Sequence, residues 1–284
     1  ETLLQNKDNA LLSKKLVTLK KDVPVRDNLE DFDLKKIDKE KLYNFLREME
    51  FNRLLSSVIS IYGEPSLNGN IKKDKNEKKN KKISRENYKL IESENDIELW
   101  LKEADENGEI AIDTETNSLD PHTADLVGIS FSTQLGKACY IPLGHKKGNL
   151  LNKEAVLQKI KKTLEDKSIK KIGQNIKFDF IVFYKQGITL SSMEDTMLMS
   201  YVLDAGKNRH NMDILSEIHL GHKTISFKEM VGTGKKEINF SEVELDKAKD
   251  YAAEDADVTF RLYKKLIKNL KLEKMINIYE IFEK

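Results

Sequence analysis

The sequence predicts an α/β fold in which helices flank a mixed central β-sheet. Three runs rich in β-forming residues, 109–116, 126–133 and 138–143, follow one another closely enough to form an antiparallel meander. The hydrophobic period then changes to that of helices, and a short strand at 169–172 stands between two helical patterns. Strands first and helices after, with one βαβ-like crossover, are typical of an α/β layer on a mixed sheet.

The helices of this part are predicted from the spacing of apolar residues. Ile97, Leu99, Trp100 and Leu101 indicate a helix before the first strand. Further helices are expected at 153–164, at 175–186, and in stretches that begin at Asp195, at Asn211 and at Ser241, the last continuing to the end of the chain.

Composition bounds the class of protein. With 284 residues, 39% hydrophobic and 34% charged, the chain is expected to form one or two globular domains. A net charge of +1 gives no global electrostatic case for nucleic-acid binding, so any such case must be local. The single cysteine, Cys139, excludes an internal disulfide framework, and no apolar run approaches the ~20 residues that span a bilayer. We therefore interpret the protein as cytoplasmic, with no membrane partner.

The first 83 residues differ from the rest. Residues 1–65 have helical character with few core positions, and 38–62 predicts one or two amphipathic helices that need a partner surface. Residues 66–83 are interpreted as a Lys-rich linker, since 66–82 holds seven Lys against two acids. A phosphate-attracting arm is the alternative. The chain starts at Glu1, without Met or a leader, which indicates a piece of a longer protein.

Two acids end the first predicted strand. Asp113 and Glu115 follow the apolar run 109–112, and alternate side chains of a strand share a face, so their Cα atoms lie roughly 6 to 7 Å apart. They could converge on one cation, although solvated acids at a turn are the plain alternative.

A third acid interrupts an apolar run. Asp179 lies within Phe178–Phe183, where an unpaired buried carboxylate would cost several kcal/mol. Asn175, four residues earlier, is expected to share its helical face and could cap the helix. A solvent-facing Asp179 is the alternative.

The fourth acid belongs to the segment 251–257. Tyr251 and Asp255 are four residues apart and stack on one helical face, within an otherwise apolar stripe. Asp257 is about 200° away around the helix and is expected to face solvent, while Glu254 competes with Asp255. Four oxygen ligands without Cys or clustered His favour two Mg²⁺ or Mn²⁺ ions over zinc.

These segments resemble, in order and spacing, the three exonuclease motifs of the proofreading domain of bacterial DNA polymerase I. They read D-T-E-T at 113–116, G-Q-N-I-K-F-D at 173–179 and Y-A-A-E-D-A-D at 251–257. The resemblance implies a 3′-5′ exonuclease domain at 84–284 with a ribonuclease H-like, DnaQ-type fold. Residues 1–65 resemble the helical tail and connector of the same polymerase's 5′ nuclease domain, so a polymerase domain would follow in the parent chain.

The resemblance also implies a reaction and roles within it. The activity would be metal-dependent 3′-5′ removal of nucleoside monophosphates from a single-stranded DNA end. Asp113, Glu115 and Asp255 would hold the metal ion on the nucleophile side, with Asp113 bridging to a second ion that Asp179 supports mostly through water. Tyr251 and Glu115 would position the attacking water.

Substrate contacts are implied at six further positions. Leu119 would wedge against the terminal bases, and Phe227 would stack on one, which tolerates any base. Phe178 stands where the family often has Tyr, which removes a hydroxyl contact but no metal ligand. Weaker candidates are Gln174, Asn175 and Arg209.

Two rival functions stay open: a 3′-5′ exoribonuclease of the same fold, and a catalytically weak structural spacer of the polymerase.

Two local patterns are set aside. Gly232–Lys236 has Glu229 where a phosphate-binding loop needs its first Gly, so it is interpreted as a flexible turn. His219 and His222 lack a further ligand, so they are interpreted as solvated or dipole-interacting rather than as a metal site.

Overall fold

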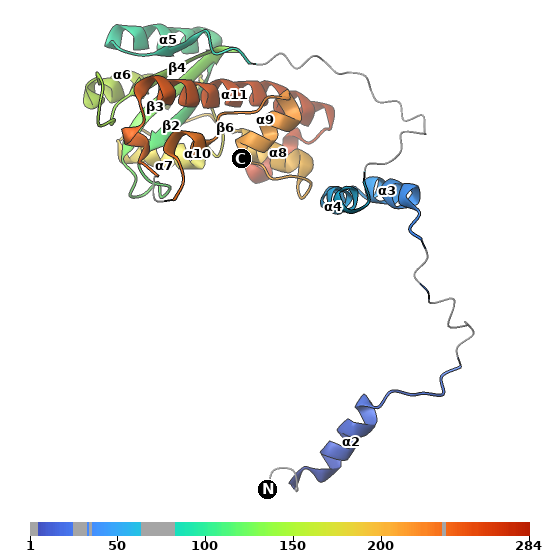
Figure 1. Ribbon diagram of the computed structural model, residues 1–284. Coiled ribbons are helices and arrows are strands. Elements are labelled where there is room, and N and C mark those ends of the chain that lie inside the picture. Colours follow the sequence, from blue (N-terminus) through green and yellow to red (C-terminus); the bar gives the residue numbers. More distant parts are fainter. Residues whose placement is uncertain (1–4, 25–32, 34–35, 64–82, 235–236) are drawn as a thin grey trace. The chain divides into compact units, whose positions relative to one another are not determined.

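The computed structural model describes residues 5–24, 33, 36–63, 83–234 and 237–284 (Figure 1). It consists of two compact units, Glu1–Asp74 and Lys75–Lys284. The predicted Lys-rich linker, apart from Ile83, and the end of the predicted turn at 235–236 lie outside the described residues.

The first unit is helical, as the sequence predicts. Its helices are α2 (Lys7–Val17), α3 (Lys39–Glu48) and α4 (Asn52–Tyr62). Helix α2 buries none of its residues. Helices α3 and α4 form a small hairpin in which Tyr43 and Leu46 are buried, and the Tyr43 hydroxyl donates to the Gly63 carbonyl at 2.5 Å.

The second unit is built on one six-stranded sheet with the order β1-β4-β3-β2-β5-β6. The predicted meander is confirmed, because β3 is antiparallel to both β2 and β4. The crossover is confirmed as well, because β5 is parallel to β2. Strands β1 and β6 were not predicted, since three residues are too few to show a period. The bounds are β1 Tyr88–Leu90, β2 Glu109–Thr116, β3 Leu126–Gln134, β4 Lys137–Pro142, β5 Lys170–Gly173 and β6 Met193–Asp195.

Helices cover both faces of this sheet. Side chains of α5, α6 and α7 pack with one face in the largest apolar cluster. Helix α11 packs against the other face and crosses the strands (Figure 1). The α-helices are α5 Glu94–Asn107, α6 Lys153–Glu165, α7 Lys177–Lys185, α8 Thr196–Asp204, α9 Met212–Leu220, α10 Phe227–Val231, α11 Leu245–Leu272 and α12 Ile276–Ile278, and two short turns are η3 Phe240–Glu242 and η4 Tyr279–Glu283. None of the described helices combines the length and apolar character that a bilayer crossing requires.

The alternation of β2 decides where its acids point. Ile110 and Ile112 belong to the cluster beneath α5 and α6, whereas Ala111 belongs to the cluster beneath α11. Because side chains alternate along a strand, Asp113 and Glu115 share the face of Ala111 and point toward α11. Small side chains, including Ser130, Ser132 and Ala138 on the sheet and Ala248, Ala252 and Ala256 on α11, are buried between the two layers and allow a close approach.

Three sequence-based expectations about where α7 and α11 begin, end or face solvent are wrong. The last helix does not continue to the chain end, because α11 stops at Leu272. Helix α7 begins at Lys177 rather than at Asn175, whose φ is 59°. Asp257 does not face solvent: it is fully buried and accepts hydrogen bonds from the Tyr88 hydroxyl at 2.9 Å and the Gly136 N–H at 2.7 Å. The reason is that β1 and the β3–β4 turn cover a second side of α11.

Candidate active site

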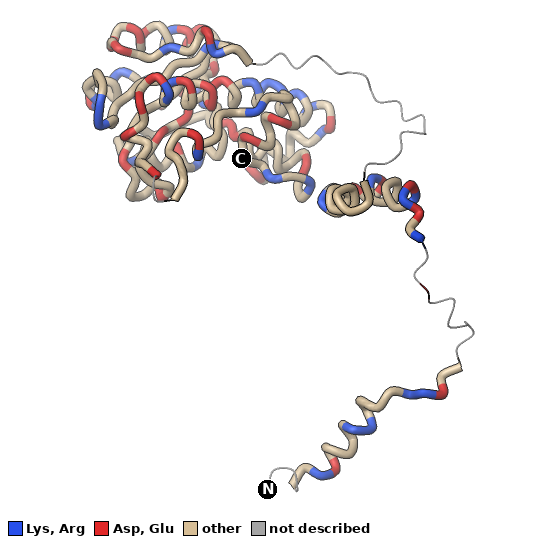
Figure 2. The backbone as a smooth tube through the Cα atoms, in the orientation of Figure 1, with Lys and Arg blue, Asp and Glu red and all other residues tan. Residues whose placement is uncertain are grey.

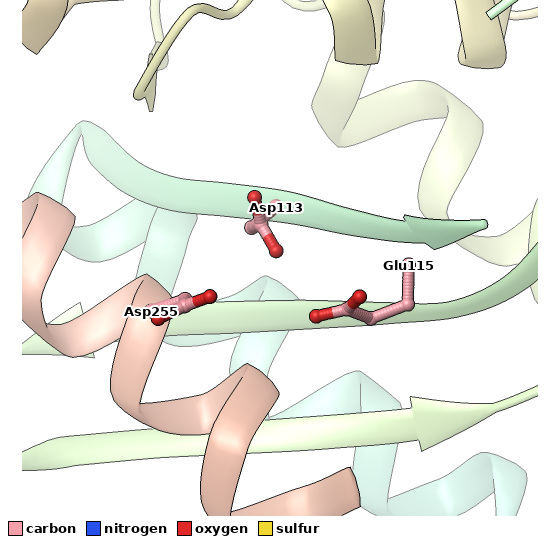
Figure 3. A group of neighbouring side chains, drawn as sticks. All are labelled: Asp113, Glu115 and Asp255. Atoms are coloured by element: carbon pink, nitrogen blue, oxygen red, sulfur yellow. The ribbon is translucent and has the colours of Figure 1, made fainter. Parts of the chain in front are cut away.

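Three of the predicted acids converge. Ligand oxygens of Asp113, Glu115 and Asp255 all lie within 4.8 Å of one another. Figure 3 shows the three carboxylates directed toward one another, two from β2 and one from α11. Glu115 and Asp255 are buried, while Asp113 keeps part of its surface accessible. The strand alternation and the close helix therefore produce an acidic cluster that is distant in sequence.

No basic group among the described residues neutralises this cluster. In the part of the chain that the structure describes, no Lys, Arg or His forms an ion pair with any of the three carboxylates. Burial raises the pKa of Asp113 well above its usual value, and the charge of Asp255 adds to the rise. Burial likewise raises the pKa of Glu115, with Asp113 as the next cause. Keeping all three ionised therefore costs free energy unless a cation is present.

The fourth acid, Asp179, lies beside this cluster with a partner of its own. It is 2% exposed, so the solvent-facing alternative is excluded, and its carboxylate accepts a 2.6 Å hydrogen bond from the Thr114 hydroxyl. Burial raises its pKa, and the charge of Asp113 contributes next. Strand β5 pairs with β2 only at Glu109–Ala111, so the later part of β2 is open on that side and α7 can approach it.

The turn before α7 is held by a residue that sequence reasoning missed. Asp195 accepts hydrogen bonds from the backbone N–H groups of Asn175, Ile176 and Met197 at 3.0, 3.1 and 2.8 Å. The expectation that Asn175 caps α7 through its side chain is wrong, because α7 has no side-chain cap and Asn175 is in the left-handed region. The signal was present in the sequence, since an Asp that precedes a helix is a common N-cap.

Tyr251 lies one helical turn before Asp255, on the same side of α11. Its hydroxyl acts as a donor that opposes the rise of the Asp255 pKa, a rise caused first by burial. Its ring packs near Phe240 and Phe227, with centroid distances of 5.9 and 6.2 Å. Phe227 also stacks on Phe240 at 6.1 Å, so the phenol is fixed by an aromatic cluster.

A pocket of about 510 Å³ opens over these groups. Its lining includes the three clustered acids and Tyr251, together with three predicted substrate residues, Leu119, Phe178 and Phe227. Leu119 is 89% exposed and Phe227 41% exposed, so both apolar side chains are accessible to a ligand in this pocket. Lining residues that the sequence did not indicate are Asn117, Ser118, Met212, Glu237, Ile238, Asn239 and Phe240.

Three weaker candidates do not line this pocket. The Gln174 side chain donates to the His210 carbonyl at 2.7 Å. Asn175 lines a different cavity beside β6 and α8, and Arg209 lines a third with Tyr201 and His210. Their roles in substrate contact stay predictions.

The competitor of Asp255, Glu254, has its own partners. It is fully buried and accepts hydrogen bonds from Arg85 at 2.8 Å and from the Ile225 N–H at 2.7 Å. His222 lies 2.9 Å from it and is 4% exposed, so the expectation of a solvated or merely dipole-interacting His222 is wrong. Glu254 therefore anchors the segment that leads into α10 and its Phe227.

The acidic cluster suits a hard divalent cation. Its donors are all carboxylate oxygens, close enough together to share an ion and without a basic partner among the described residues. Oxygen-only donors are typical of Mg²⁺, Mn²⁺ and Ca²⁺ sites rather than of zinc. The residues thus fit a divalent ion, and the donor set does not distinguish between these metals.

Comparison with known sequences places residues 88–271 in one family model. That model is described as a 3′-5′ exonuclease. A curated relative, DNA polymerase I of Pseudomonas aeruginosa, is 36% identical over 275 residues and matches 95% of this chain but 29% of its own length. The chain thus spans less than a third of that relative.

Solved structures share the fold at low identity. The polymerase domain of Pol1 from M. smegmatis, in complex with DNA primer-template and dNTP, aligns with a TM-score of 0.54 and 15% identity over 69% of this chain and 30% of that chain. RNase D of Escherichia coli, an exoribonuclease involved in structured RNA processing, aligns with a TM-score of 0.51 and 17% identity over 68% and 48%. The predicted ribonuclease H-like fold is confirmed.

Proposed function

The chain belongs to the 3′-5′ exonuclease family, and from this premise we propose that it removes nucleoside monophosphates from the 3′ end of a DNA strand as the proofreading part of a DNA polymerase I. The observation that carries the proposal is the convergence of Asp113, Glu115 and Asp255 on one pocket without a basic partner among the described residues. The family and the site therefore support the same chemistry.

Two divalent ions, Mg²⁺ or Mn²⁺, are proposed as cofactors. Asp113, Glu115 and Asp255 would hold one ion, and Asp113 together with Asp179, the latter indirectly, would contribute to the site of the second. When bound, such ions lower the pKa of a water and neutralise charge on the leaving oxygen of a phosphodiester. The Thr114 hydroxyl already occupies one oxygen of Asp179, which suits an indirect role for this acid.

The remaining side chains orient the reactants. The Tyr251 phenol and the Glu115 carboxylate flank the same pocket and would position the attacking water by hydrogen bonds. Leu119 would wedge against the terminal bases, and Phe227 would stack on one of them. Stacking and apolar contact are tolerant of base identity, as removal of any misincorporated nucleotide requires.

The substrate has to be recognised locally. Lys and Arg are interspersed with Asp and Glu along α5, α6 and α11, whereas α8 and α9 carry acids only, so no described helix of the second unit is purely basic (Figure 2). With a net charge of +1, a long-range field contributes little to DNA binding. Recognition would depend on the pocket side chains and the bound cations.

We further propose the domain arrangement of the parent protein. Residues 84–284 would be the exonuclease domain, 66–83 a linker, and 1–65 the helical tail and connector of a 5′ nuclease domain. A polymerase domain would be the partner that delivers the DNA end.

The test is a time course on 5′-labelled single-stranded DNA with Mg²⁺, with chelator, and with the Asp113→Ala variant as the control. The expected result is a metal-dependent ladder that shortens from the 3′ end and is absent in the variant. An RNA strand of the same sequence, cut faster than DNA, would identify an exoribonuclease instead. Intact DNA with both Mg²⁺ and Mn²⁺, despite metal binding, would identify a structural spacer.

A further inference from the structure

A buried tyrosine–histidine pair lies next to the acidic cluster on the sheet. The Tyr140 hydroxyl is 2.7 Å from Nε2 of His145, and Nδ1 of His145 is 3.1 Å from the Val243 carbonyl. A carbonyl can only accept, so Nδ1 carries the hydrogen. Burial lowers the pKa of His145, which favours the neutral ring. Nε2 is then an acceptor, and the Tyr140 hydroxyl donates a hydrogen bond to it.

The strand register places the Tyr140 hydroxyl beside Glu115. Glu115 on β2 pairs with Gly128 on β3, and a Cβ atom at Gly128 would lie 2.1 Å from the Tyr140 oxygen. Residues directly opposite each other on antiparallel strands share a face, with Cβ atoms about 4.5 to 5.5 Å apart. The Tyr140 hydroxyl therefore occupies the side-chain space next to Glu115, which is available only because residue 128 is Gly.

The electrostatics agree with this placement. Burial is the first cause that raises the pKa of Tyr140, and the negative charge of Glu115 is the second. A buried hydroxyl that loses its acceptor costs about 1 to 3 kcal/mol, so it turns to another acceptor within reach. For Tyr140 without His145, the Glu115 carboxylate is a neighbouring charged acceptor, and a charged acceptor is favoured over a neutral one such as the Ser130 hydroxyl.

We propose that His145 is a positioning residue. It accepts a hydrogen bond from the Tyr140 hydroxyl and thereby prevents this hydroxyl from donating a hydrogen bond to Glu115, so that the Glu115 carboxylate stays free to bind a divalent cation. The inference rests on the proposed function for the presence of that cation. It assigns a role to two residues outside the three exonuclease motifs, 145 lying in the loop after β4.

The substitution His145→Phe tests this role. It removes the acceptor but keeps a ring where His145 packs against Tyr140 and Phe240, with centroid distances of 5.8 and 5.9 Å. Calorimetric titration of the full chain with Mg²⁺ should show an affinity about tenfold weaker, in the range found when an outer partner of a metal ligand is lost. Adding Tyr140→Phe to this variant should restore the affinity to within about threefold of the wild type, because the competing hydroxyl is gone.

Restored Mg²⁺ affinity in the double variant would distinguish a positioning role of His145 from general damage to the fold. If His145 only supported the fold, the double variant would bind Mg²⁺ as weakly as His145→Phe or more weakly, and that result would overturn the proposal. Unchanged Mg²⁺ affinity in His145→Phe would overturn it too. Should His145→Phe melt below the assay temperature, His145→Met supplies the same test with a more adaptable side chain.

The matched control is Tyr88→Phe. It removes another buried hydroxyl of the same sheet, one that donates to Asp257 at 2.9 Å, and should leave Mg²⁺ affinity unchanged. Cleavage of single-stranded DNA, measured in parallel, keeps the two proposals apart. If the wild type binds Mg²⁺ but leaves DNA intact, the proposed exonuclease activity is contradicted. If the wild type cuts DNA and His145→Phe binds Mg²⁺ with unchanged affinity, only the role of His145 is contradicted.

Discussion

Replacing Asp113 by Asn should stabilise the metal-free protein while it abolishes cleavage. The substitution keeps the shape of the side chain and removes one of three carboxylates whose ligand oxygens lie within 4.8 Å of one another. Most substitutions in a protein destabilise it, so a gain in stability would be specific evidence for repulsion in a site that requires a cation.

The magnitude follows from the spacing. Two unit charges 4.8 Å apart repel by roughly 3.5 kcal/mol at an effective dielectric constant of 20. The carboxyls avoid most of this cost by binding protons, as the raised pKa values of Asp113, Glu115 and Asp255 indicate. We expect a net gain of about 1 to 3 kcal/mol at neutral pH, which corresponds to roughly 2 to 10 °C in melting temperature for a unit of this size.

The assay is thermal unfolding of both proteins, first with chelator and then with Mg²⁺. With chelator, Asp113→Asn should melt at the higher temperature. Mg²⁺ should raise the melting temperature of the wild type more than that of the variant, because only the wild type has the full ligand set. Asp105→Asn removes a charge from the exposed side of α5 and serves as the control. A variant that melts at or below the wild-type temperature with chelator would refute the argument from repulsion.

Three further outcomes test the site. Tyr251→Phe should slow cleavage about 10- to 100-fold without changing Mg²⁺ affinity, and a collapse of that affinity in calorimetry would show that its role is wrongly assigned. Thr114→Val, which leaves Asp179 without its hydroxyl donor, should lower stability by about 1 to 3 kcal/mol in denaturant unfolding, and an unchanged midpoint would contradict the importance of this hydrogen bond. With chelator, the free energy of unfolding of the wild type, relative to that of Asp113→Asn, should fall as the pH rises above the ordinary carboxyl pKa values of 3.8 and 4.5. The reason is that the folded state still holds protons that the unfolded state has released. Melting curves at a series of pH values measure this difference, and a difference that stays constant or favours the wild type more at higher pH would contradict the raised pKa values.

The sequence was sufficient for the elements with a clear period. The antiparallel meander, the strand at 170–173 and the helix that carries Asp255 were all predicted, since each has an apolar pattern that extends over several residues. The three-residue strands β1 and β6 and the five-residue helix α10 were missed, because so short a segment has no period and is formed by its neighbours in space. The same reason explains the error at Asp257, where helical phase alone could not show that β1 covers that side of α11.

The sequence by itself determined which candidate residues share a face: alternation in β2 placed Asp113 and Glu115 on one face, and helical spacing placed Tyr251 and Asp255 on another. Only the tertiary structure decided that these faces meet, that Thr114 holds Asp179 beside them, and that Tyr140 and His145 approach from the far side of Gly128. Local patterns set the direction of a side chain relative to its own element. Distances between elements depend on how closely the layers pack, which here follows from small side chains buried between the sheet and α11.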